Sequence, residues 1–76
     1  MDNWGNGYFV QDRGRECELL YFAGYIDDGD HITEDWRMIA RTQGDEVVLK
    51  GDYTESDAKM VEEFAEYFDC TIKKSA

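Results

Sequence analysis

Hydrophobic and β-forming residues gather in short runs between turn residues over the first fifty positions, and recur with a helical period after them. The pattern predicts a first strand over Gly7–Asp12 and a second over about Glu16–Ile26, joined by a turn at Asp12–Arg15. The second run is almost continuously apolar. It therefore favours a central strand covered, at least in part, on both faces.

The segment 34–42, which follows a turn predicted at Asp27–Asp30, fits two structures. Apolar residues at positions 36, 38 and 40 alternate as in a strand, whereas those at 36, 39 and 40 also fit a helix capped by Thr33. A strand is favoured, because residues 42–46 lead directly into Val47–Leu49 as a hairpin turn does.

The C-terminal third contains the clearest element, an amphipathic helix capped by Thr54 or Ser56 and running to about Phe68. At about 100° per residue, its apolar side chains fall on one half. They are Met60, Val61, Phe64, Ala65, Tyr67 and Phe68. A short strand over Cys70–Lys73 is expected to return to the sheet edge. The predicted fold is a single α+β domain over residues 1–76: an antiparallel sheet of four to five strands with one C-terminal amphipathic helix packed on it.

The chain is strongly acidic, with 18 Asp and Glu against 8 Lys and Arg and a net charge of −10. Direct binding to nucleic acid or to an anionic membrane needs a basic face, so both are excluded as partners. No apolar run is long enough to span a bilayer and the N-terminus does not resemble a signal peptide, so we expect a cytoplasmic protein. The charge favours a basic protein or nucleoprotein partner.

The acidic residues are concentrated in two segments, 27–35 and 55–69, which hold eleven of the 18 acidic residues and one of the 8 basic ones. Like charges three or four positions apart on a helix are unfavourable, and an acid at a helix C-terminus opposes the dipole. A face that is merely exposed to solvent would account for charged residues, but it would not account for the clustering of acids in these two segments. We therefore predict partner-binding residues at Asp27, Asp28, Asp30, Glu34, Asp35, Glu55, Glu62, Glu63, Glu66 and Asp69.

Catalysis and metal binding find little support. His31 is the only histidine and has no nucleophile at a recognisable spacing. The acidic loop lacks the ligand spacing of an EF-hand, so neither a metal nor another cofactor is expected. Cys17 and Cys70 are interpreted as buried thiols, and their pairing stays open. The stretch Gly5–Gly7 is interpreted as a flexible entry, and Trp4 as an exposed anchor or as a cover for a sheet edge.

In size and acidity the chain resembles the small phage-encoded inhibitors of bacterial defence, the anti-CRISPR and anti-restriction proteins. It is also similar to the acidic immunity proteins that neutralise nuclease toxins. The resemblance covers overall character and no motif. It implies a nucleic-acid mimic that blocks a basic nucleic-acid-processing protein. The alternatives are a structural or adaptor subunit that binds through an apolar sheet face, and a metal-binding acidic module.

Overall fold

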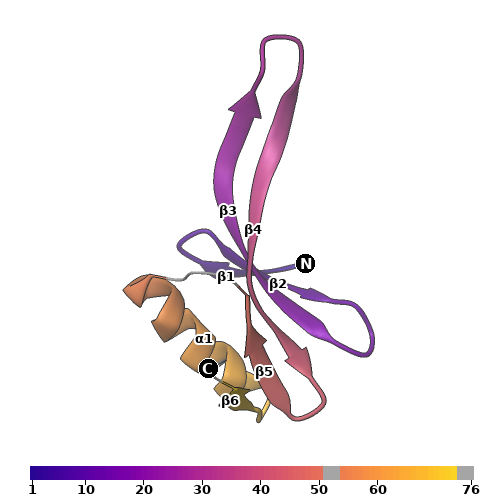
Figure 1. The fold of residues 1–76 in the computed structure, drawn as a ribbon, viewed down its shortest axis with the longest axis vertical. Coiled ribbons are helices and arrows are strands. Elements are labelled where there is room, and N and C mark those ends of the chain that lie inside the picture. The colour runs from indigo at the N-terminus through magenta and orange to yellow at the C-terminus, as the bar shows by residue number, and fades with distance from the viewer. Residues whose placement is uncertain (51–53, 74–76) are drawn as a thin grey trace.

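The computed structural model describes residues 1–50 and 54–73. These residues form a sheet of six strands in sequential order and one helix. The elements are β1 (Asp2–Gly5), β2 (Tyr8–Asp12), β3 (Cys17–Asp27), β4 (Ile32–Gln43), β5 (Glu46–Leu49), α1 (Glu55–Tyr67) and β6 (Thr71–Lys73). Figure 1 shows α1 beside the lower part of the sheet, with β3 and β4 rising far beyond it.

The α+β class and the packing of a C-terminal helix on the sheet are confirmed, and segment 34–42 is a strand within β4. The predicted number and direction of strands are not correct. The described part of the chain has six strands instead of four to five, and β6 pairs with β5 in parallel, in register Val47↔Ile72. Because α1 carries the chain back along the sheet, the strand after it runs in the same direction as the strand before it.

The additional strand is β1, and the stretch Gly5–Gly7 that follows from its last residue is a tight turn instead of a flexible entry. Asn6 and Gly7 both have positive φ, 55° and 88°, and they join β1 to β2 in a tight hairpin. A two-residue Asn-Gly loop favours this turn, because its backbone twist matches that of the flanking strands. A side chain at position 7 would also meet the Tyr21 ring, 3.0 Å from the place of its Cβ.

Both ends of α1 are set by local hydrogen bonds. At the start, the Thr54 hydroxyl accepts from the Asp57 N–H while the Asp57 carboxylate accepts from the Thr54 N–H, so Thr54, not Ser56, is the cap. At the end, the Cys70 N–H donates to the Ala65 carbonyl and the Asp69 N–H to the Glu66 carbonyl. This pair of bonds requires a left-handed residue after the helix, and Asp69 takes that conformation, with φ 53°.

The core lies between α1 and one face of the sheet. Alternate residues of β2 and β3, among them Tyr8, Val10 and Leu19, point toward α1, whose Val61 and Phe64 are buried against them. The apolar half of the helix is thus confirmed in its central turns. Its last turn differs from the prediction. Tyr67 is 71% exposed, and its ring meets those of Trp4 and Phe68 edge to face.

The upper part of β3 and β4 forms a two-stranded arm, which we define as residues 24–35. A register shift between Phe22 and Gly24 marks its base, where Gly24 has a φ of 110°. Below that point β3 pairs with β2, whereas along the arm β3 and β4 pair only with each other among the described residues. In Figure 1 the arm projects away from the rest of the molecule, which is 42 Å along its longest axis.

Within residues 1–50 and 54–73, no helix packs on the second face of the sheet. Leu20 and Phe22 on β3 and their partners Met38 and Trp36 on β4 point to the side opposite the core. Of these four, only Leu20 is buried. The central position of β3 is confirmed, but α1 covers only one of its faces. We call the other side the bare face.

Candidate functional site

The acidic segment 27–35 forms the end of the arm. Asp27, Asp28, Asp30 and Glu34 are exposed and Asp35 is half-buried. Two of these carboxylates shape the turn. Oδ1 of Asp27 accepts from the Gly29 N–H at 2.9 Å, and Oδ1 of Asp28 accepts from the His31 N–H at 2.9 Å. Turn formation therefore accounts for two of the five acids and leaves three for another use.

The second acidic segment follows the outer side of α1. Glu55, Glu62, Glu63 and Glu66 are all exposed and lie away from the core, as the helical period predicts. Asp69 is also exposed, but its left-handed backbone gives it a role in ending the helix.

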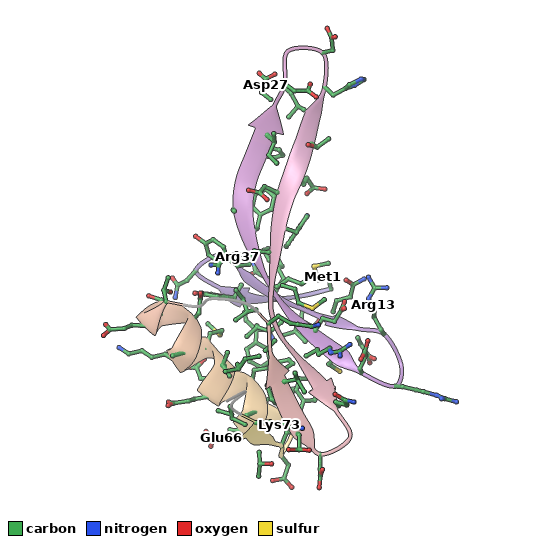
Figure 2. All side chains as sticks on the ribbon, viewed as in Figure 1. Met1, Arg13, Asp27, Arg37, Glu66 and Lys73 are labelled. Carbon is green, nitrogen blue, oxygen red and sulfur yellow. The ribbon has the colours of Figure 1, made fainter. Side chains whose placement is uncertain are left out.

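The structure does not bring the two acidic segments together. Figure 2 shows Asp27 at the end of the arm and Glu66 on the helix at the opposite end of the molecule. A contact surface composed of both would have to extend along most of the 42 Å axis. The ten predicted residues therefore form two separate acidic surfaces.

None of the ten predicted carboxylates is held in an ion pair within residues 1–50 and 54–73. The pairs found there join Arg13 to Glu18, Arg37 to Asp57 and Arg41 to Glu16, at 2.6, 3.2 and 3.8 Å. These pairs use acids outside the predicted set, so the described bases leave the two acidic surfaces uncompensated.

Aromatic side chains gather on the bare face at the base of the arm. The Trp36 ring lies between those of Phe9 and Phe22, with centroids 5.2 and 4.9 Å away, and Phe22 in turn contacts Tyr25 at 5.3 Å. These rings meet edge to face or tilted, the preferred arrangements for aromatic pairs. Together with Met1 and Glu34, these four rings line a hollow of about 330 Å³.

Apolar surface continues from this hollow in both directions. Toward the lower sheet, Leu20 and Met38 line a neighbouring hollow of about 360 Å³, which the polar side chains of Gln11, Arg13 and Glu18 border. Toward the end of the arm, Tyr25 and Ile32 are 69% and 70% exposed. Isolated exposed apolar residues are ordinary, but a contiguous apolar stripe with carboxylates beside it is typical of an interaction surface.

Sequence reasoning did not find this surface among its candidate residues. The apolar residues at 20 and 22 were interpreted as part of a strand covered, at least in part, on both faces. Those at 36 and 38 were interpreted as alternating strand positions, and alternation alone does not distinguish a covered face from a bare one. The available signal was the number of helices. One helix of 13 residues can cover only one face of a sheet.

A buried polar cluster lies on the core side, below the N-terminus of α1. Asp57 is 1% exposed, and its carboxylate accepts hydrogen bonds from the Tyr8 hydroxyl, the Arg37 guanidinium and the Thr54 N–H. Burial acts to raise the pKa of Asp57, but these hydrogen bonds outweigh it and lower the pKa. Burial, followed by the bond to Asp57, raises the pKa of Tyr8 to about 12.

This cluster is best explained as structural. The cluster borders a hollow of about 470 Å³, but the Asp57 carboxylate directs its bonds to groups of the protein itself. The spacing of Thr54 and Asp57 is that of a capping box, a sequence signal for a helix start. The partners of Asp57 on β2 and β4, Tyr8 and Arg37, are brought to it by the strand register, which cannot be deduced from the sequence.

The two cysteines are free and half-buried, beside the core instead of fully inside it. Burial raises the pKa of Cys17, with smaller effects from Asp12 and Cys70, and burial likewise raises the pKa of Cys70. A raised pKa lowers the thiolate fraction and with it the reactivity of a thiol. The interpretation as structural thiols is therefore favoured over a redox site.

Trp4 covers the sheet edge instead of standing free. It is half-buried in β1, with its ring centroid 6.0 Å from that of Phe64 and 5.3 Å from that of Tyr67. In the part of the chain that the structure describes, no cluster of three or more His, Cys, Asp or Glu side chains is arranged to hold a metal ion. Nor do the described residues include a helix with the length and apolar character needed to cross a membrane.

The fold and these surfaces define the chain as a small α+β protein with a bare sheet face and a protruding acidic arm. Comparisons with known proteins add no relative. No protein-family model matches the chain, and no curated protein or solved structure is similar enough to count as a match.

Proposed function

We propose that the chain is a non-enzymatic binding protein that attaches to a basic protein through its arm and bare face. The observation that carries this proposal is the apolar surface on the bare face, which extends from the aromatic hollow to Tyr25 and Ile32. It lies beside acids of the arm that form no ion pair with a described base. An apolar surface supplies affinity, and carboxylates around it select a basic partner and steer it into place.

We further propose that this attachment inhibits a nucleic-acid-processing protein by denying nucleic acid access to its basic surface. Proteins that process nucleic acids present clustered Lys and Arg, which suit an acidic arm. The exposed carboxylates of α1 add to the negative charge that attracts such a partner from a distance, but they are not part of the proposed contact surface.

The proposal is tested by capture from nuclease-treated bacterial lysate on the immobilised protein at low and moderate salt. A face variant carries Tyr25→Ser, Ile32→Ser and Glu34→Lys. A matched helix variant carries Glu66→Lys and Tyr67→Ser, which also removes an exposed aromatic ring and reverses an exposed carboxylate. Mass spectrometry identifies the captured proteins, and added duplex DNA or RNA tests whether nucleic acid displaces them.

We expect the wild type and the helix variant to capture the same basic, nucleic-acid-binding proteins, and the face variant to lose them. Moderate salt should weaken the capture and nucleic acid should elute it. Capture of neutral or acidic proteins that is indifferent to salt would instead support the adaptor function. Equal capture by the face variant would exclude the bare face as the binding surface.

A further inference from the structure

We propose that the hollow lined by Met1, Phe9, Phe22, Tyr25, Glu34 and Trp36 is a recognition site for an arginine side chain. The proposal rests on the proposed function, in which a basic partner supplies the arginine. It adds the chemical group that the hollow selects and the residues that select it.

The hollow combines the two features that recognise a cation. Aromatic faces attract a positive charge through their quadrupole, and a carboxylate pairs with it directly. Trp36 and Glu34 are two positions apart on β4, so both point to the bare face, and Glu34 is in register with Tyr25 on β3. Both Tyr25 and Glu34 line the hollow.

The site is preformed and its charge is not neutralised within the described chain. Trp36 and Tyr25 are held by contacts to Phe22, so the walls do not depend on a ligand for their arrangement. Among the described residues, neither a Lys, Arg or His side chain nor the N-terminal amine of Met1, which also lines the hollow, forms an ion pair with Glu34. Its volume of about 330 Å³ is at the lower end of the range for ligand sites, which suits one side chain better than a large ligand.

The same protein already holds an arginine in this manner on its other face. The Arg37 guanidinium carbon lies 5.3 Å from the centroid of the Tyr21 ring, and its Nη1 donates to the Asp57 carboxylate at 3.2 Å. An arginine in the hollow would repeat this arrangement, with a ring below the guanidinium and a carboxylate at its edge.

Arginine fits this chemistry better than the other candidates. Its planar guanidinium stacks on aromatic rings, pairs with a carboxylate through two N–H groups and is more weakly hydrated than the ammonium of lysine. A nucleotide would bring phosphates toward Glu34 and the acids of the arm, which repel them. A second copy of this chain would bring its own net charge of −10 to the same surface.

The test is a two-dimensional ¹H–¹⁵N NMR titration of the full chain with the capped tripeptide Gly-Arg-Gly. Matched tripeptides carry citrulline, which keeps the shape and lacks the charge, or lysine. The indole N–H of Trp36 reports on the hollow, and that of Trp4, which packs on the core side, is an internal control. The variants are Glu34→Gln and, as a control for general charge attraction, Glu62→Gln on α1.

We expect saturable shifts of Trp36 and of its neighbours on the bare face, with Trp4 unchanged. Citrulline, lysine and the Glu34→Gln variant should each weaken binding by about fivefold or more, whereas Glu62→Gln should bind like the wild type. An unchanged Trp4 resonance in each variant verifies the fold.

The proposal is overturned if Trp36 shows no saturable shift, or if the citrulline or lysine tripeptide binds as tightly as the arginine one. It is also overturned if Glu34→Gln binds as tightly as the wild type, or if Glu62→Gln weakens binding as much as Glu34→Gln does. A shift of Trp36 with protein concentration alone would likewise overturn it, because a second copy of the chain would then occupy the bare face. This titration uses no partner protein, so its failure leaves the capture experiment to decide the proposed function. Conversely, failed capture leaves an arginine site that is established by titration intact.

Discussion

Asp57 joins three elements through one carboxylate. It caps α1 through Thr54, accepts from Tyr8 on β2 and pairs with Arg37 on β4. Because removal of the carboxylate leaves the buried Tyr8 hydroxyl and the first turn of the helix without a partner, the whole cluster depends on this residue.

Replacement of Asp57 by alanine should lower the free energy of unfolding by about 2–4 kcal/mol, from the lost cap and the lost charge-assisted hydrogen bonds. Tyr8→Phe should cost less, about 1–2 kcal/mol, because Asp57 keeps its other donors. Urea unfolding followed by Trp fluorescence measures both. The exposed Glu62→Ala is the control and should change stability by less than about 0.5 kcal/mol. A loss at Asp57 no larger than at Glu62 would contradict this role.

The same cluster predicts a pH dependence with two limits. The pKa of Asp57 is lowered in the folded state, so its contribution is present above its ordinary pKa of 3.8 and is lost as the pH falls through the lower folded value. The pKa of Tyr8 is raised from 10.0 to about 12, so its contribution is present below pH 10.0 and is lost as the pH rises to about 12.

Unfolding measured across pH for the wild type, Asp57→Asn and Tyr8→Phe isolates these contributions as differences between curves. The difference in free energy of unfolding between the wild type and Asp57→Asn should disappear in acid. The difference between the wild type and Tyr8→Phe should disappear between pH 10.0 and about 12. Differences that stay constant across these ranges would show that neither group is coupled to folding as described.

At the level of elements, Asp69 at the end of α1 has a structural role, unlike the exposed acids of the arm that are available for binding. Asp69 takes a left-handed conformation that glycine adopts without strain, and its charge lies at the unfavourable end of the helix dipole. We expect Asp69→Gly to stabilise the protein by about 0.5–1 kcal/mol in thermal or urea unfolding, with no loss of partner capture. Weaker capture by this variant would return Asp69 to the set of contact residues.

The arm is the second element with a distinct expectation. A two-stranded hairpin without neighbours is only marginally stable in water, because its outer backbone groups face solvent. Amide hydrogen exchange in the free protein should therefore be fast over residues 24–35 and slow over β2 and the lower part of β3. Slow exchange along the arm at the level of the core would mean that other contacts hold it, contrary to the described pairing.

Local signals predicted some of these elements and missed others for physical reasons. The helix and the hairpin from β4 to β5 follow from capping, periodicity and turn residues close together in the chain. The Asn6–Gly7 turn was an equally local signal, and recognition of it would have predicted β1. The bare face and the contacts of Asp57 depend on register between distant strands, and no local pattern encodes that register.

For the molecule as a whole, the fold changes the meaning of its charge. Residues 27–35 and the outer side of α1 were predicted together as partner-binding residues, but Asp27 on the arm and Glu66 on α1 lie at opposite ends of the molecule (Figure 2). The distances between the charged groups follow from the length of β3 and β4, which extend past their neighbours in the sheet. Charge counts alone predicted the basic class of partner, whereas the apolar surface that would hold it required the structure.

We propose that the arm and the bare face bind the partner. Amide hydrogen exchange of this protein alone and in complex with a captured partner tests this proposal. We expect added protection over residues 24–38, on the arm and the adjoining strand segments, with the exchange of α1 unchanged. Protection confined to α1, with the arm exchanging as it does in the free protein, would contradict it.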